Sequence, residues 1–522
     1  MALAAMVALA ALAPRASAAP NEWNWELSAE RYKKMAVFER AQYDKAAGLL
    51  RDKSYKAAAT EFEKLKEQFP DSPNTSRIVL LRAYSLHMAK TRIAAVKLYN
   101  EILDYFADVV DDAAPAIYLM GKAHLENGDT AKGLRTLKDM VDNEKYQKHP
   151  LAAGALRMVA DAYWKRGEYE NAVNYWKQAV RDFSRSNAQE AAISREDVTA
   201  WYFFARDYAG YDSWRLDEKT QNDPKVRCAV AAHIVSVAWN IATGQGNYTY
   251  PMKKERDAKE HAAKLPDDLK ACWAYFKTTK PVFEKNNDLW GYYSTGVNFL
   301  GGCVRDKKDL EDMVAEVVAF VKAIPDKAAA DGKWSWLIDR ACEWGDYTRA
   351  NYFLPYLSDK FASAWKGYEI LAHQKKWKEA LSHLELIEGM GNEPLRARAM
   401  ETRAAIYKDC TGEYEKAIKL YTDINKPPGT LWAIQECHYR LNRLEQALTQ
   451  LTEIENMFPN EAPEAAWTKA TYFDRAKRQK ECIAQARRIL KLYPKSPASS
   501  RAHQLLEKYG IATGGGVKDD DE

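Results

Sequence analysis

The sequence has few glycines and prolines and no strong excess of charge of either sign. Its 522 residues include 24 Gly and 19 Pro, and 77 basic residues against 73 acidic ones give a formal net charge of +4. Scarce glycine and proline disfavour a turn-rich all-β protein and are typical of long helices. The balanced charge and the lack of a basic stripe give no support to nucleic-acid binding.

Motifs that carry chemistry are also absent. The seven cysteines stand singly and form no CxxC pair, so zinc ribbons, thioredoxin-like sites and haem attachment are unsupported. No P-loop, Rossmann fingerprint, GxSxG or HExxH occurs, and the nine histidines are dispersed. Paired acids such as Asp111 and Asp112 fit a solvated helix face. We therefore predict no catalytic residue, no metal ligand and no cofactor, and cysteines that serve as small buried packing residues.

The first twenty residues, MALAAMVALAALAPRASAAP, differ in kind from the rest of the chain. An uncharged apolar run is followed by Ala16-Ser17-Ala18, the small-x-small pattern of a signal-peptidase site. The run is too short to span a bilayer comfortably, and no later stretch is apolar enough for a membrane helix. We predict a signal peptide over residues 1–18, cleaved after Ala18, and a soluble mature chain in the periplasm or outside the cell. A mitochondrial transit peptide is the alternative, but its Arg-rich pattern is absent.

A repeated pattern of small and large apolar residues runs through the N-terminal part. Tetratricopeptide (TPR) motifs are helix pairs of about 34 residues, with small residues where the two helices cross closely. The clearest example here is the stretch ADAYWKRGEYENAVNYWKQAV. The small residues expected in the second helix of each pair are spaced 37, 38 and 39 residues apart, at Ala58, Ala95, Gly133 and Ala172.

The same pattern returns in the C-terminal part. Small residues at the equivalent second-helix position are Ala350, Ala380, Ala417, Ala447 and Cys482. The turn before Ala417 carries one extra residue, and residues 497–509 predict one more helix that caps the last apolar face. Repetition on this scale indicates a solenoid of stacked helix pairs.

The repeats define the predicted fold and its parts. Residues 185–330 keep apolar runs of helical period but lose the small anchors, so they are either degenerate helical hairpins or a helical insert. We predict an all-α, TPR-type solenoid, wound as a right-handed superhelix of antiparallel helix pairs. Its parts are an N-terminal TPR array at 19–184, a divergent helical region at 185–330, a C-terminal TPR array with a capping helix at 331–510 and a disordered tail at 511–522.

The repeat boundaries FPDSPNTSRIVLLRAYSL and YPKSPASSRAHQLLEKYG resemble those of periplasmic bacterial TPR proteins. These are the outer-membrane-assembly lipoprotein BamD and the cell-division coordinator CpoB (YbgF-like). The resemblance covers residues 40–183 and 335–509, at the level of the repeat class. It implies a non-catalytic scaffold for protein–protein interactions in the bacterial cell envelope. The chain lacks the lipid-bearing cysteine of BamD and differs from both in length, so no specific partner carries over.

In TPR proteins, ligands usually lie in the groove lined by the first helices of the repeats. Carried over one by one, those positions predict a partner-binding groove formed by Tyr43, Arg77, Tyr84, Tyr118, Lys122, Arg157, Asp161, Trp164, Trp432, Tyr439 and Trp467. Exposed Tyr, Trp and Arg contribute strongly to binding. The Asn and Lys set with which chaperone-binding TPRs hold a C-terminal carboxylate is absent, because the central Asn position holds Ala47, Tyr84, Lys122 and Asp161.

The aromatic segment AWYFFARDYAGYDSW supports an alternative function. Its Trp201 and Trp214 could stack on sugar rings, which would make the chain a glycan- or peptidoglycan-binding module. The same rings also fit a helix core with a packed loop. The predicted partners are therefore one or more proteins, with cell-wall glycan as the alternative.

Overall fold

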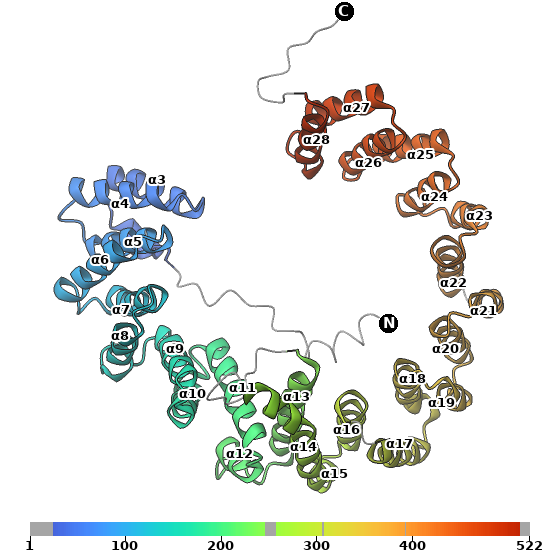
Figure 1. Cartoon of the computed structure of the whole chain (residues 1–522), viewed down its shortest axis with the longest axis horizontal. Coiled ribbons are helices and arrows are strands. Elements are labelled where there is room, and N and C mark those ends of the chain that lie inside the picture. Colours follow the sequence, from blue (N-terminus) through green and yellow to red (C-terminus); the bar gives the residue numbers. More distant parts are fainter. Residues whose placement is uncertain (1–24, 246–256, 305–306, 392, 512–522) are drawn as a thin grey trace, which may run out of the picture. The chain divides into compact units, whose positions relative to one another are not determined.

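The computed structural model describes residues 25–245, 257–304, 307–391 and 393–511. The predicted signal peptide at 1–18 and residues 512–522 of the predicted tail lie outside these ranges. The described residues form helices joined by turns and contain no β-strand (Figure 1). The prediction of an all-α fold of the TPR type, with consecutive helices packed in pairs, is confirmed. The handedness of the superhelix stays a prediction.

The chain divides into two compact units, Met1–Glu316 and Val317–Glu522. The helices of the first unit are α2 (Ala29–Lys33), α3 (Val37–Arg51), α4 (Tyr55–Gln68), α5 (Thr75–Met88), α6 (Arg92–Tyr105), α7 (Val110–Glu126), α8 (Thr130–Asp142), α9 (Leu151–Lys165), α10 (Tyr169–Phe183), α11 (Ala188–Ala205), α12 (Tyr208–Arg215), α13 (Pro224–Thr243), α14 (Asp257–Thr278), α15 (Lys280–Lys285) and α16 (Leu289–Cys303). Helix α17 (Lys307–Lys322) contains the boundary between the units.

The second unit continues the helical repeat. Its elements are α18 (Lys327–Glu343), α19 (Tyr347–Phe353), η1 (Leu354–Tyr356), α20 (Lys360–His373), α21 (Trp377–Met390), α22 (Glu393–Ile406), η2 (Tyr407–Thr411), α23 (Tyr414–Ile424), α24 (Gly429–Arg440), α25 (Leu444–Met457), α26 (Ala462–Arg475), α27 (Gln479–Leu492) and α28 (Pro497–Lys508). The element η2 is a π-helical turn, and it lies where the sequence carries one extra residue before Ala417. A π turn takes up a single inserted residue without breaking the helix.

Small residues allow the paired helices to approach closely, as predicted. Ala58, Ala95 and Ala172 are 0% exposed. A Cβ atom at Gly133 would lie 2.7 Å from the Leu125 side chain, which is far inside van der Waals contact. A larger residue would therefore push the two helices of this pair apart.

Consecutive first helices of the pairs also contact one another. In the first unit α5 contacts α7, α7 contacts α9 and α9 contacts α11, in addition to the contacts within each pair. Side chains on the first helices therefore lie between two neighbouring repeats. This arrangement decides how much of each predicted groove residue reaches the surface.

Helix α13 organises the last part of the first unit. It contacts α11, α14, α15 and α16, so the helices no longer pack only on their neighbours in sequence. The prediction that no stretch after the N-terminal run is apolar enough for a membrane helix is wrong for α13, which among the described residues is the one helix long and apolar enough to cross a membrane by length and composition, with a mean hydropathy of 1.3. A core helix of a water-soluble protein passes the same test, and α13 buries Val230, Ile234 and Val237 in the unit's interior.

The cysteines follow the packing prediction with one clear exception. Cys482 lies on α27 in the core formed with α28 and is 0% exposed. Cys228, Cys272, Cys342 and Cys437 are also buried and Cys303 is half-buried, but Cys410, in the π turn, is exposed. The prediction is therefore wrong for Cys410, which lies in the exposed part of the turn between α22 and α23.

Candidate protein-binding surface

The predicted groove residues lie on first helices in both units. Helices α3, α5, α7 and α9 carry eight of them in the first unit, and α24 and α26 carry three in the second. Tyr43, Arg77 and Tyr118 are buried, and the other eight are half-buried. The exposure expected of these three residues is thus wrong, because neighbouring helices cover them. Binding through any of the eleven stays a prediction.

Tyr43 belongs to the core of the first helix pair. Its ring packs edge-on against Tyr32 and Phe62, with centroids 6.0 and 6.3 Å away. Its hydroxyl accepts a hydrogen bond from the backbone N–H of Leu27 at 3.2 Å, and burial raises the pKa of the phenol. Only 4% of Tyr43 is exposed, so it offers a partner almost no surface.

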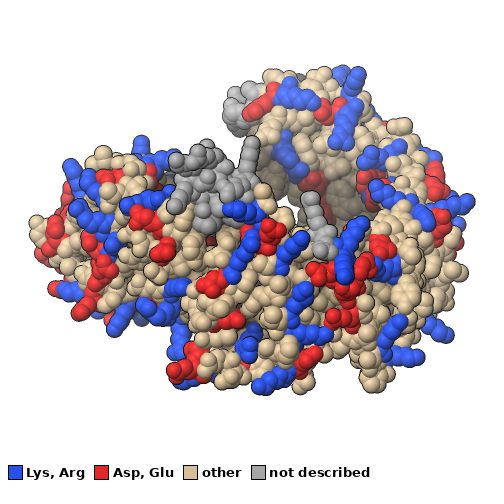
Figure 2. Space-filling model, turned by 60° about the horizontal axis from the view of Figure 1, so that its bottom comes forward, with Lys and Arg blue, Asp and Glu red and all other residues tan. Residues whose placement is uncertain are grey.

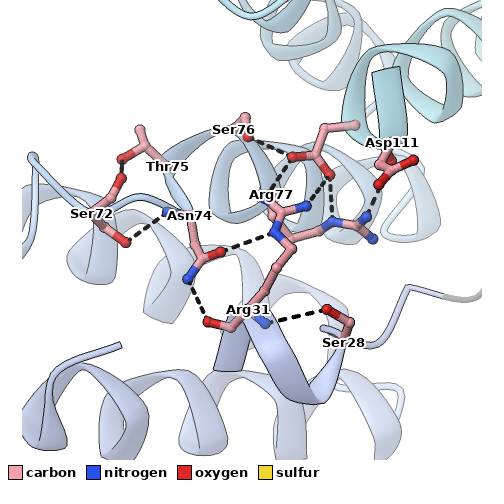
Figure 3. Close-up of polar contacts among 9 residues, drawn as sticks. Ser28, Arg31, Ser72, Asn74, Thr75, Ser76, Arg77 and Asp111 are labelled. Atoms are coloured by element: carbon pink, nitrogen blue, oxygen red, sulfur yellow. Dashed lines mark hydrogen bonds and ion pairs between the residues drawn. The ribbon is translucent and has the colours of Figure 1, made fainter. Parts of the chain in front are cut away.

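Arg77 is held by the buried carboxylate of Asp112. Its Nε donates to Asp112 Oδ1 at 2.6 Å, and its Nη2 donates to the backbone carbonyl of Asp111 at 3.1 Å. Figure 3 shows Arg77 and Arg31 converging from two helices on this place. Arg31 Nη1 and Nη2 donate to the two oxygens of Asp112 at 3.0 and 2.9 Å. The Arg77 guanidinium therefore forms these hydrogen bonds inside the protein.

Two more polar side chains complete the Asp112 network. Ser76 donates to Asp112 Oδ2 at 2.5 Å, and Arg31 Nε donates to Asn74 Oδ1 at 3.0 Å (Figure 3). The network ties α2 and α5 to α7. The sequence-based assignment of Asp112 to a solvated face is wrong, because this carboxylate is 0% exposed and neutralised by two arginines, whereas Asp111 is exposed.

Arg157 likewise pairs inside the protein. Its Nε donates to Glu190 Oε2 at 2.5 Å and its Nη1 to Asp161 Oδ2 at 3.1 Å. Asp161 also accepts a hydrogen bond from Trp176 Nε1 at 3.2 Å, and burial raises the pKa of Asp161. The structure brings Tyr118 to the same place, where burial and then the charge of Glu190 raise its pKa to about 12. These groups join α7, α9, α10 and α11.

Half-exposed aromatic rings gather beside this polar group. The Trp164 ring lies 4.7 Å from Tyr169, 5.2 Å from Trp176 and 6.0 Å from Trp201, measured between ring centroids. Trp176 is buried, while Trp164, Tyr169 and Trp201 are half-buried. We call these three half-buried rings the Trp164 surface. It joins a predicted groove residue to Trp201, one of the two tryptophans of the glycan alternative.

The rest of the aromatic segment packs inward. Phe203 and Tyr211 are 0% exposed, and Tyr202 is buried between Tyr211 and Trp214, whose rings lie 6.0 and 5.9 Å from its own. Trp201 and Trp214 therefore belong to different aromatic groups. The core interpretation of the segment is confirmed for these buried rings.

The remaining predicted residues make contacts within their own unit. Tyr84 packs against two neighbouring apolar cores, and Lys122 lies 3.9 Å from Glu126. Tyr439 stacks on Tyr472 of the next first helix at 3.8 Å.

Two predicted tryptophans of the second unit also make contacts within that unit. Trp432 Nε1 donates to Glu461 Oε2 at 3.2 Å. The Trp467 ring faces the guanidinium of Arg501 at 5.0 Å. Both side chains thus make contacts within their own unit.

The residues that contact the predicted groove residues were not identified from the sequence. Asp112, Glu190 and Tyr169 were not among the predicted site residues, and each lies on a different helix from the groove residue that it contacts. Asp112 stands in the first turn of α7 one residue after Asp111, and nothing in the sequence distinguishes the buried carboxylate from the exposed one. Among the described residues, no group of three or more His, Cys, Asp or Glu could hold a metal ion.

No protein-family model matches the chain, and no curated protein matches it. A solved structure that matches is the crystal structure of the APC/C hetero-tetramer Cut9-Hcn1, at 12% sequence identity, with coverage of 93% of this chain and 99% of that chain. The TM-score is 0.28, so the two chains do not superpose as whole molecules. The helix pairs, their small crossing residues and the contacts between successive first helices define the fold: the chain is a TPR-type helical repeat protein.

Proposed function

We propose that the chain is a non-catalytic scaffold that binds partner proteins, and that the Trp164 surface is its contact in the first unit. The observation that carries the proposal is the gathering of three half-exposed aromatic rings on consecutive helices of a repeat array. Tyr and Trp supply large contact area at low cost in conformational entropy. The partly buried Arg157–Glu190 and Asp161–Trp176 contacts lie beside the rings and join the helices that carry them.

The Trp164 surface can be tested with a double variant and a matched control. Replacing Trp164 and Tyr169 by Ala should reduce capture of protein partners about tenfold or more, because hot-spot aromatics each contribute about 2 kcal/mol. The control is Tyr105→Ala, which removes a ring that is 77% exposed on α6. Capture is measured by crosslinking and mass spectrometry with the full chain in its native host, and a circular dichroism melt verifies folding. Unchanged capture by a folded double variant would place the binding surface elsewhere.

A glycan-binding module is the second candidate, because Trp201 belongs to the same surface. Aromatic rings that present a face can stack on sugars. The Trp201→Ala variant distinguishes the protein-binding function from the glycan-binding function. Loss of binding to soluble peptidoglycan fragments, with no protein captured by the wild type, would replace the scaffold proposal by the glycan one.

We also propose that the scaffold is exported and acts in the bacterial cell envelope. The support is the Ala-rich run with Ala16-Ser17-Ala18 and the resemblance of the repeat boundaries to the BamD and CpoB class. N-terminal sequencing of the protein from its native host should begin at Ala19. Mature soluble protein that still begins at Met1 would refute export.

A further inference from the structure

Two arginines and a histidine gather in the first unit at a place where three helices meet. Arg195 lies on α11, Arg215 is the last residue of α12 and His233 lies on α13. All three side chains are half-buried. We call them the Arg195–Arg215–His233 cluster.

One ring nitrogen of His233 accepts a hydrogen bond from Arg215 and lies close to two hydroxyl groups, whose own protons are donated to the backbone carbonyls of Val230 and Arg195. Arg215 Nη1 lies 3.1 Å from His233 Nδ1, and the hydroxyls of Tyr211 and Thr199 lie 3.3 and 3.5 Å from it. A guanidinium can only donate, so Nδ1 accepts and the proton of the neutral ring is assigned to Nε2. Burial, followed by the charges of Arg215 and Arg195, lowers the pKa of His233 to about 3. The ring is therefore neutral at physiological pH and cannot neutralise an acid by itself.

The position of Thr199 indicates that the side chain of Arg195 belongs to the same cluster. Its hydroxyl donates to the backbone carbonyl of Arg195 at 2.7 Å, one helical turn earlier, so both side chains lie on one face of α11. Burial and then the positive charge of Arg215 lower the pKa of Arg195. The charge of Glu196, the next residue, acts in the opposite direction and does not offset them.

Neither arginine of the cluster has an acidic partner. Within the part of the chain that the structure describes, no carboxylate lies within ion-pair distance of Arg195 or Arg215. Two other arginines close to α11 do have an acidic partner: Arg157 pairs with Glu190, and Arg206 pairs with Asp268 at 2.6 Å. Arg195 and Arg215 differ from these two arginines in that neither has an acidic partner.

The protein does not lack acidic groups elsewhere. Figure 2 shows acidic and basic side chains interspersed over the face in view, with neither sign dominant. Two guanidinium groups that are partly withdrawn from water repel each other and lose hydration. Such an arrangement is unfavourable in the free protein and becomes favourable when an anion binds between the two charges.

We propose that the Arg195–Arg215–His233 cluster binds a carboxylate from an acidic segment of the partner protein. The planar guanidinium matches a carboxylate with two parallel hydrogen bonds, and two of them hold it more firmly than lysines would. His233 Nδ1 is occupied by Arg215, and this contact orients the guanidinium. The inference rests on the proposed function as a protein-binding scaffold and names the chemistry of the partner.

The test measures peptide binding to the purified full chain by fluorescence anisotropy. The probes are a labelled glutamate-rich peptide and its glutamine counterpart of equal length, with inorganic phosphate as a competitor. The wild type should bind the glutamate peptide and not the glutamine one. The double variant Arg195→Gln, Arg215→Gln should bind the glutamate peptide about tenfold or more weakly, since charge-assisted hydrogen bonds are lost.

A second double variant controls for net charge. Arg181→Gln with Arg227→Gln also removes two positive charges from exposed positions of the same unit, and it should bind as the wild type does. Equal weakening in both double variants, or equal binding of the two peptides, would overturn the proposal. Competition by phosphate without any binding of the glutamate peptide would also overturn it, in favour of a small-anion site.

A single variant provides a further test of the cluster. Arg195 makes no side-chain hydrogen bond within the described ranges, so the single variant Arg195→Gln removes no internal hydrogen bond and should fold normally. Unchanged peptide affinity in this folded variant would contradict the proposal. Because the assay uses purified protein and a synthetic peptide, its failure is separate from a failure of partner capture by the Trp164 surface.

Discussion

Replacing Asp112 by Ala is expected to destabilise the first unit by about 3–5 kcal/mol. The carboxylate is 0% exposed, and its removal leaves the Arg77 guanidinium buried and that of Arg31 half-buried, each without its counter-charge. Breaking a buried ion pair on one side costs more than the pair itself contributes, because the remaining charge cannot be rehydrated. The measurement is the urea-unfolding midpoint of the full chain, followed by circular dichroism.

The neighbouring carboxylate gives the control for this variant. Asp111→Ala removes an exposed side chain and should change stability by less than about 0.5 kcal/mol. Equal effects of the two substitutions would contradict the assigned burial of Asp112.

The loss of stability caused by Asp112→Ala should also depend on pH, and the pKa shift of Asp112 gives the direction of this dependence. Burial raises the pKa of Asp112, but the hydrogen bond from Arg31 and the charge of Arg77 outweigh it, and the net pKa is lowered. A carboxyl group with a lowered native pKa stabilises the fold above its unfolded pKa of about 4, and this contribution is lost as the pH falls through the native value. The difference between wild type and variant should therefore shrink below about pH 4.

Replacing Glu455 by Ala should destabilise the second unit by a similar amount, about 3–5 kcal/mol. Glu455, on α25, accepts hydrogen bonds from Lys469 Nζ of α26 at 2.8 Å and from the Tyr493 hydroxyl at 2.9 Å. Arg488 of α27 lies 2.6 Å from the same carboxylate. The side chains of Glu455 and Lys469 are 3% and 9% exposed, so the variant leaves a buried ammonium without a partner.

Two variants distinguish this mechanism from a general loss of helix stability. Glu453→Ala, at an exposed position of the same helix, should have little effect. The double variant Glu455→Met with Lys469→Met should regain part of the lost stability, because neither charge is then left unpaired. If the double variant is as unstable as Glu455→Ala, the loss of packing, and not the unpaired ammonium of Lys469, causes the destabilisation.

The repeat pattern was predictable from the sequence because it follows from a local rule. Wherever two helices cross closely there is no room for more than a methyl group, so each pair leaves a small residue at a fixed place in the sequence. Ala58, Ala95 and Ala172 were predicted on this basis and are fully buried. The same reasoning located Cys482 in the core.

The candidate site was predictable only to the level of the helices that carry it. Trp164 and Trp201 entered the sequence analysis in separate hypotheses, and only the packing of α9 beside α11 brings their rings to 6.0 Å. The Arg195–Arg215–His233 cluster gave no sequence signal, because its members come from three helices of the region without repeat anchors. Contacts between residues far apart in sequence leave no periodic trace in the sequence.

The sequence by itself determined the all-α repeat fold and the positions where helices cross, since helical period and residue size act over a few neighbouring residues. Only the tertiary structure decided which polar side chains are satisfied inside the array. Arg77, Arg31 and Asp112 were all compatible with a solvated helix face, and the meeting of α2, α5 and α7 turned them into one buried network. The physical reason is that burial of a charge depends on the helices that cover it, and those helices lie up to 81 residues away along the chain.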